Sequence, residues 1–337
     1  MDSWLTSYDY HLPRELIAQR PSPEREQSRM MVLHREDQSI EHAAFTELPR
    51  FIRRDDLLVL NNSRVLPARH FSDDGVLEFL IVQKIAPARW KALVKPGRRF
   101  RAGTVTSIRG ICATAGNADE EGLREIILDE DVDLQASGAM PLPPYISRPP
   151  EVEDMSRYQT VFARTDGSIA APTAGLHFTA EILNGLSHTF ITLHVGIGTF
   201  RPVKSENIPD HTMHQEQFSI SPEAAAAINA GGRVVAVGTT SVRVLESVHR
   251  QFGGIRAVEG ATNIFIHPPF QFRVVDALLT NFHLPRSTLL MLVSAFAGRE
   301  FILRAYAEAV RERYRFFSYG DCMLILQQTS TWSGMTA

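Results

Sequence analysis

The strongest constraint on the fold is a change in the sequence pattern between residues 70 and 150. Short segments such as VLEFLIVQ, WKALVK, TVTSIRGICATA and LREIILDE alternate or are β-branched, and Gly, Asp and Asn turns separate them. None of them shows a helical period. Short strands with such turns are typical of a small antiparallel β-barrel. The stretch ends in MPLPPYISRPPE, whose five prolines favour a stiff connection.

The sequence on both sides of this stretch mixes strand and helix patterns. DLLVLNN and RVVAVG have the composition of buried strands. SPEAAAAINAGG predicts a helix with Ser221 as its N-cap, Pro222 in its first turn and a glycine stop. We therefore predict an α/β fold, in which a large mixed α/β domain (residues 1–69 and 151–337) contains an inserted antiparallel β-barrel domain (residues 70–150).

Residues 170–216 are rich in chemically reactive side chains. Apolar residues alternate in FITLHVGI, which predicts a strand over residues 190–197 with His194 on its less apolar face. The glycines of the following GIGTFRP let backbone approach a ligand closely. Because sites gather at such sheet edges, we predict an active site here. Its candidate residues are His177, His194, Thr199, Arg201, His211, His214 and Glu216.

A metal site is the first alternative for this stretch. A metal-dependent hydrolase could use His211, His214 and Glu216 as ligands. In an extended chain, however, His214 and Glu216 share a face and His211 points away, whereas a helix aligns the two histidines and leaves the glutamate aside. The spacing therefore argues against a metal, and we predict a site without one.

Polar residues follow other predicted strands as well. RVVAVG runs into TTSVRVLESV, so amides of Thr239, Thr240 and Ser241 at a helix N-terminus would receive a carboxylate or phosphate. Simple capping by a threonine is the alternative. Arg243 and Glu246, three residues apart, would either serve the site or pair with each other. Further candidates for substrate binding are Asn61, Arg64, Asn281, His283, Tyr319 and Asp321.

One segment, WKALVKPGRRFRAG, is strongly basic and contains no acid. Its basic residues are Lys91, Lys95, Arg98, Arg99 and Arg101. A charge run is usually a solvated loop. In this segment, however, Trp90, Pro96 and Phe100 lie between the charges, as in a turn that presents charges to a phosphate backbone. The sequence leaves both interpretations open.

Composition excludes several classes of protein. With 337 residues, 44% of them hydrophobic and 22% charged, the chain is typical of a globular protein of about two domains. No apolar run has the length of a membrane span and the N-terminus lacks a signal-peptide pattern, so we expect a cytoplasmic protein without membrane contact. Cys112 and Cys322 indicate neither a disulfide framework nor a zinc cluster. The net charge of −3 does not decide nucleic-acid binding, which depends on local clusters.

Taken together, longer motifs resemble the S-adenosylmethionine:tRNA ribosyltransferase-isomerase family of the queuosine pathway. The resemblance extends over residues 8–326. It rests on YDYHLPRELIAQRP, NNSRVLPAR, WKALVKPGRR, APTAGLHFT, LHVGIGTFRPV, MHQE, VVAVGTTSVRVLES, TNFHLPRSTLLMLVSAFAGRE and RYRFFSYGDCMLI. Asn62 and Asn263 depart from the family pattern, which usually has Asp there, and Pro269 replaces a Gly.

The resemblance implies a large α/β domain with an inserted β-barrel, and S-adenosylmethionine as co-substrate without a metal. The partner is then a tRNA with a GUN anticodon that carries 7-aminomethyl-7-deazaguanine at the wobble position. The implied reaction attaches a rearranged ribose, gives epoxyqueuosine-tRNA and releases adenine and methionine. We expect the protein to be a monomer.

The implied chemistry assigns provisional roles to the candidate residues. The sulfonium acidifies C5′ of the donor and adenine leaves only when protonated, so the reaction needs a base and an acid. The candidates are His177, His194, His214 and Glu216. The methionine carboxylate suits the helix N-terminus at Thr239 with Arg243, and tRNA phosphates suit Lys95, Arg98, Arg99 and Arg101. A tRNA-binding protein without catalysis is the second alternative.

Overall fold

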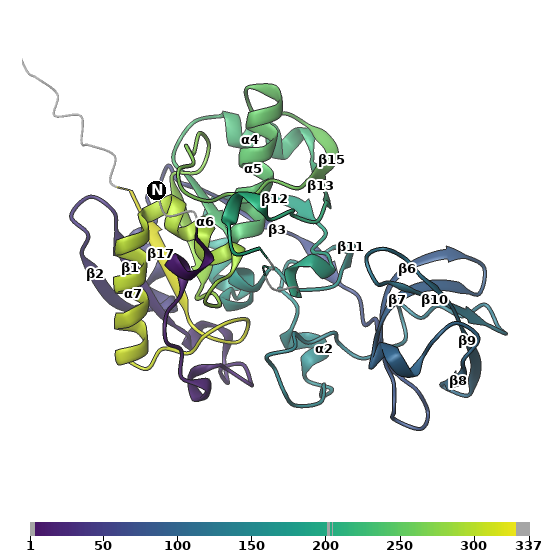
Figure 1. Ribbon diagram of the computed structural model, residues 1–337. Coiled ribbons are helices and arrows are strands. Elements are labelled where there is room, and N and C mark those ends of the chain that lie inside the picture. Colours follow the sequence, from purple (N-terminus) through teal and green to yellow (C-terminus); the bar gives the residue numbers. More distant parts are fainter. Residues whose placement is uncertain (1–3, 201–202, 204, 328–337) are drawn as a thin grey trace, which may run out of the picture.

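The computed structural model describes residues 4–200, 203 and 205–327. Nine strands form one mixed sheet in the order β15-β13-β12-β3-β14-β16-β17-β1-β2 (Figure 1). They are β1 (Arg29–His34), β2 (Ile40–Ala44), β3 (Leu57–Asn61), β12 (His188–Leu193), β13 (Glu216–Ile220), β14 (Val234–Val237), β15 (Val258–Thr262), β16 (Ala277–Asn281) and β17 (Cys322–Leu326). Strands β12, β3, β14 and β16 run parallel, so their carboxyl ends share one edge. Strands β13 and β17 are antiparallel to their neighbours β12 and β16 and begin at that edge.

The sheet separates two hydrophobic cores. In β3, Leu57 and Val59 face one core while Leu58 and Leu60 face the other, as the alternation of a strand requires. The helices that pack into the first core are α4 (Pro222–Asn229), α5 (Thr239–Phe252), α6 (Thr288–Ala297) and α7 (Arg299–Arg311). The second core is covered by the short helices α1 (Leu48–Phe51) and α3 (Ala180–Asn184) and by aromatic rings.

Local sequence explains where the longer helices begin. The hydroxyls of Ser221 and Ser287 accept hydrogen bonds from the amides of Ala224 and Leu290, so these serines cap α4 and α6. The cap at Ser221 is the one predicted above. Helix α5 follows Gly238, whose φ of 86° favours glycine. The first turn of α5 therefore starts directly at the end of β14.

Six strands form a second, curled sheet, drawn in blue in Figure 1. They are β5 (Arg69–Phe71), β6 (Glu78–Ala86), β7 (Arg89–Lys95), β8 (Val105–Ile108), β9 (Ile111–Ala118) and β10 (Arg124–Leu128). All neighbours in the order β5-β6-β7-β10-β9-β8 are antiparallel, around a core that contains Phe79, Trp90 and Phe100. The expected mixed α/β fold with a separate antiparallel sheet is thus confirmed. Closure into a full barrel and the domain limits stay predictions.

The second sheet is inserted into the first through a pair of short strands. Strand β4 (Ser63–Val65) follows β3, and β11 (Thr165–Ser168) runs parallel to β4. All six strands of the curled sheet lie between them in the sequence. The proline-containing connection then leads to the short helix α2 (Asp154–Arg157) before β11 begins.

Strand β12 ends earlier than the sequence predicts, at Leu193 rather than at residue 197. Beyond it, the Val195 amide donates to Ser168 Oγ at 3.0 Å and the Gly196 amide to the Glu216 carboxylate at 3.0 Å. Side chains therefore accept these two amides in place of the backbone of a neighbouring strand. Within the part of the chain that the structure describes, no helix is long and apolar enough to cross a bilayer.

Candidate active site

The carboxyl ends of the parallel strands bring most of the predicted site together. Asn61 ends β3, Asn281 ends β16, and His194 follows β12. Glu216 begins the antiparallel β13 and so lies at the same edge. Open α/β sheets bind ligands at this edge. Residues that are more than 200 positions apart in the sequence thus border one region.

His177 ends the turn η6 (Thr173–His177), which packs against β16. Its Nδ1 lies 2.9 Å from Ser28 Oγ, and its Nε2 lies 3.3 Å from Asn281 Nδ2. Because Ser28 Oγ donates to the Arg25 carbonyl and Asn281 offers an N–H, these bonds assign the ring proton to Nδ1. Burial lowers the pKa of His177 to about 4. The ring is therefore neutral near pH 7, as a general base must be.

Glu216 and Arg243 form an ion pair inside the protein, with exposed fractions of 5% and 6%. The second carboxylate oxygen of Glu216 accepts the Gly196 amide. Arg243 Nε donates to the Ile264 carbonyl at 3.4 Å, while its Nη2 is buried and has no partner among the described residues. An ordered water or a ligand oxygen would satisfy this buried guanidinium nitrogen.

The alternative pairing of Arg243 with Glu246 is wrong. The Glu246 carboxylate accepts backbone amides of Arg273, Val274 and Val275 at 3.0 to 3.2 Å. It thereby fixes the connection that leads into β16. Arg243 turns instead toward β13, so the three-residue spacing on α5 does not decide its partner.

The N-terminus of α5 is the predicted anion site. Its N-cap is Gly238, which has no side-chain hydroxyl, so the alternative of a threonine cap is also wrong. Ser241 Oγ donates to the Val237 carbonyl at 2.9 Å. Thr240 Oγ1 is buried and has no partner in the described part of the chain. The first amides of Thr239 and its neighbours have no acceptor within the helix, as in any α-helix.

His194 and His214 each lie against a glycine. A Cβ atom on Gly167 would come within 2.7 Å of the His194 ring, and one on Gly198 within 2.7 Å of the His214 ring. His194 is half-buried, and burial lowers its pKa while Asp166 opposes the shift. Its Nδ1 has no partner among the described residues. The two glycines thus allow both rings to approach the backbone.

The residues of the metal alternative have other contacts. Glu216 is paired with Arg243, and the His211 ring packs edge-on against Phe265 at 5.3 Å. Over the described ranges, no three His, Cys, Asp or Glu side chains form a group that could hold a metal ion. These contacts give the metal-dependent alternative no support.

Asn61 and His283 use their polar atoms to support this edge. Asn61 Nδ2 donates to the Leu193 carbonyl at 2.9 Å, and its Oδ1 accepts the amides of Leu193 and Ser63 at 3.0 Å. His283 Nε2 lies 3.0 Å from Thr280 Oγ1, and burial lowers the pKa of His283 to about 3. Their proposed contacts with substrate stay predictions.

Tyr319 and Asp321 are likewise bonded within the protein. The Asp321 carboxylate accepts the amides of Arg29 and Arg315 at 2.9 and 2.8 Å, and burial raises its pKa. Tyr319 donates its hydroxyl proton to Asp154 at 2.7 Å. Both residues order the turn that precedes β17. Of the remaining predicted residues, the Thr199 side chain and all of Arg201 lie outside the described part.

The basic loop follows β7 and contains the turn η5 (Gly97–Arg99). Phe100 is buried and anchors it in the core of the curled sheet. Its exposed basic residues are Lys95, Arg98, Arg99 and Arg101. The ion pairs of this sheet lie elsewhere: Arg69–Glu78, Lys84–Asp131, Arg89–Glu125 and Lys91–Asp119. Lys91 is therefore the paired member of the predicted cluster, while Arg64 on β4 is a further exposed cation.

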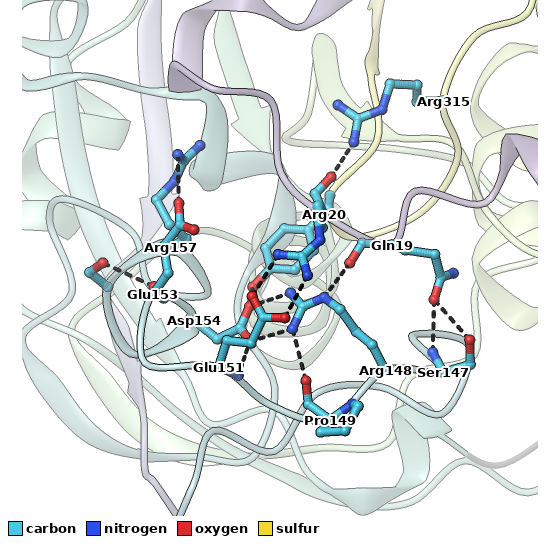
Figure 2. Close-up of polar contacts among 12 residues, drawn as sticks. Gln19, Arg20, Ser147, Arg148, Pro149, Glu151, Glu153, Asp154, Arg157 and Arg315 are labelled. Atoms are coloured by element: carbon cyan, nitrogen blue, oxygen red, sulfur yellow. Dashed lines mark hydrogen bonds and ion pairs between the residues drawn. The ribbon is translucent and has the colours of Figure 1, made fainter.

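A polar cluster around Asp154 was missed by the sequence analysis (Figure 2). The buried Asp154 carboxylate accepts two bonds of 2.7 Å from Arg148, and Arg148 Nε donates to the Gln19 carbonyl. Arg20 pairs with Glu151 at the surface. The sequence feature that could have indicated this cluster is the pair of segments RPSPERE and SRPPEVED, in which charged residues of opposite sign lie next to prolines. The cluster ties the N-terminal segment to the connection before α2.

A family model described as queuosine biosynthesis protein matches residues 5–325. The chain belongs to this family. Within the queuosine biosynthesis proteins, it is 51% identical to the S-adenosylmethionine:tRNA ribosyltransferase-isomerase of Symbiobacterium thermophilum, over 96% of this chain and 99% of that protein. It is 47% identical to the enzyme of that name from Desulforamulus reducens, over 96% and 99%.

A solved structure of the family supports the same assignment. The fold is similar to the crystal structure of S-adenosylmethionine tRNA ribosyltransferase from Thermotoga maritima, with a TM-score of 0.56 and 39% identity over 95% of this chain and 100% of that one. The resemblance predicted from the motifs is thus confirmed, and with it the classification of this queuosine-family protein as an enzyme.

Proposed function

We propose that this protein transfers and isomerises the ribosyl moiety of S-adenosylmethionine onto 7-aminomethyl-7-deazaguanine at the tRNA wobble position, giving epoxyqueuosine-tRNA, adenine and methionine. The observation that carries the proposal is the 51% identity, over nearly the full length of both chains, to a named ribosyltransferase-isomerase. The polar groups at one edge of the large sheet support it, because the reaction needs a base, an acid and an anion site in one place.

The proposed acid and base are drawn from two groups of side chains. His177 packs near the end of β16, whereas His194, His214 and Glu216 gather around the end of β12. Strands β12 and β16 are separated by three inter-strand spacings of roughly 4.8 Å, which is about 14 Å. One group would act at C5′ and the other at the adenine, and the neutral form of His177 suits the base.

The methionine carboxylate of the donor is assigned to the N-terminus of α5. Two buried polar atoms there support this, since Thr240 Oγ1 and Arg243 Nη2 have no partner among the described residues. A carboxylate would accept hydrogen bonds from both and from the first amides of the helix. Asn281 and Thr239 border the same edge.

The tRNA is assigned to the curled sheet, which we propose to be a β-barrel domain. Its exposed cations at Lys95, Arg98, Arg99 and Arg101 suit the phosphates of a stem-loop with a GUN anticodon. The reaction as written needs no metal. We place the protein in the cytoplasm, as a monomer, where its tRNA substrate is found.

The test is mass spectrometry of nucleosides after incubation with S-adenosylmethionine and an anticodon stem-loop that carries the aminomethyl base. We expect epoxyqueuosine and an equal amount of free adenine. S-adenosylhomocysteine in place of adenine would indicate a methyltransferase. Stem-loop binding without consumption of S-adenosylmethionine would support the tRNA-binding protein without catalysis and overturn the proposal.

A further inference from the structure

A small pocket lies between the N-terminal segment, α2 and the turn η6. It is a shallow hollow open to solvent, with about 260 Å³ of empty space when the adjoining solvent is included. Its lining includes Ser22, Arg25, Ser28, Arg157, His177 and Tyr319. Glu24, which is exposed, also borders it. The pocket therefore brings two guanidinium groups and several hydroxyl groups close to a proposed catalytic histidine.

Arg25 has no compensating acid in the part of the chain that the structure describes. Its Nη1 donates to the Leu176 carbonyl at 3.1 Å and its Nη2 to the Ser156 carbonyl at 2.8 Å, both neutral groups. Within the described residues, no carboxylate lies at ion-pair distance from it. Burial and the nearby charge of Arg157 lower the pKa of the Arg25 guanidinium, so its positive charge is destabilised in the free protein. An anion in the pocket would relieve this.

Arg157 contributes a second, weakly compensated charge. It donates to the Ser22 and Pro23 carbonyls at 2.6 and 2.7 Å, and its Nε is buried without a partner among the described residues. Glu153 lies 3.6 Å away, but its side chain is 60% exposed, so solvent screens this contact (Figure 2). Two guanidinium groups whose described hydrogen-bond acceptors are neutral carbonyls thus lie beside one opening.

We propose that this pocket binds a phosphate group of the tRNA backbone beside the modified nucleotide, with Arg25 as its principal ligand. The inference rests on the proposed function and specifies how the RNA is held. Guanidinium groups match the two free oxygens of a phosphodiester. The lining is also partly apolar, through Pro21, Leu176 and Tyr319, so the donor methionine is the competing ligand that the test below distinguishes.

The position of the pocket gives the contact a role beyond affinity. His177 lines it, and the charge of Arg25 is one of the causes that lower the pKa of His177. A phosphate on Arg25 would offset this effect and raise the basicity of the imidazole. Correct seating of the RNA would therefore prepare His177 for proton transfer, and a bound donor alone would not.

The test combines Arg25→Gln with single neutral methylphosphonates at each phosphate of the anticodon loop, in stem-loop binding assays on the full-length protein. At one position, we expect neutralisation to weaken binding to the wild type about five- to tenfold and binding to Arg25→Gln by less than twofold. Arg25→Lys should retain part of this coupling. Arg54→Gln, an equal charge change in the turn before β3, should behave as the wild type.

The inference is overturned if, at every phosphate position, the loss of affinity caused by the methylphosphonate is the same in Arg25→Gln as in the wild type. An increase in KM for S-adenosylmethionine without a change in RNA affinity would overturn it as well, because the pocket would then hold the donor carboxylate. Thermal melting identifies misfolding of Arg25→Gln, in which case Arg25→Lys supplies the same comparison. Failure of the proposed function itself is distinct, since the wild type would then produce no epoxyqueuosine.

Discussion

Glu216 and Arg243 form an ion pair that is almost completely shielded from solvent and joins the first residue of β13 to the first turns of α5. The same carboxylate accepts the Gly196 amide, so the pair also fixes the chain just beyond β12. His194 lies two residues before Gly196. The position of one proposed catalytic ring therefore depends on this buried pair.

Glu216→Gln should lower the free energy of unfolding by about 3 to 5 kcal/mol, because it leaves the buried Arg243 without its counter-charge. Differential scanning calorimetry would measure the change. Glu151→Gln is the matched control, since it breaks the exposed pair with Arg20, which solvent screens, and should have a much smaller effect. Equal losses in the two variants would contradict the difference in burial.

Stability should fall as the pH is lowered through the range from 6.5 to 4. His177 has its pKa lowered from 6.5 to about 4, so in this range protons bind the unfolded chain and not the folded one. The loss attributable to His177 is on the order of 3 kcal/mol, at about 1.4 kcal/mol per pKa unit. In His177→Gln, melting temperatures at pH 5 and pH 7 should lie closer together than in the wild type. The exposed control His11→Gln should keep the wild-type difference.

Gly167→Ala should reduce kcat at least tenfold, since the new Cβ would lie 2.7 Å from the His194 ring and displace it. Gly110→Ala is the control for the backbone, because Gly110 also has a positive φ but faces open space. Steady-state kinetics on both variants, with their melting temperatures, would separate a local displacement from a general loss of stability. Normal turnover by Gly167→Ala would show that the position of His194 is not critical.

The double variant Arg98→Ala/Arg99→Ala should weaken stem-loop binding about tenfold and reduce the salt dependence of the binding constant. Each lost phosphate contact lowers the slope of log K against log salt by about 0.7 to 0.9. Lys91→Ala should have a smaller effect, because Lys91 is paired with Asp119. Affinity of the wild type that is unchanged between low and high salt would rule out a phosphate-binding role for the loop.

Local patterns were sufficient for much of the fold. The capping serine and proline of α4 lie within one turn of the residues that they organise, and the strand that ends at Asn61 is a continuous apolar run. Short-range signals of this kind depend on backbone geometry alone. The same holds for the turns that separate the strands of the curled sheet.

The side-chain partners at the site could not be predicted in this way. Arg243 lies three residues from Glu246 in the sequence, yet it pairs with Glu216, 27 residues away. Arg25 reaches Ser156 across 131 residues. Such pairs depend on how strands are ordered in the sheet and on where a connection returns, and no local spacing encodes either. The family motifs identify the residues without their partners.

The parallel pair of β4 and β11 places the departure and the return of the chain side by side. The six strands of the curled sheet can change in length or sequence while the order of the nine strands stays the same. Evolution can therefore alter the proposed RNA contacts of the basic loop without changing the sheet edge that carries the proposed catalytic residues. Differences among relatives in tRNA preference should accumulate in the curled sheet, and the large sheet should diverge more slowly.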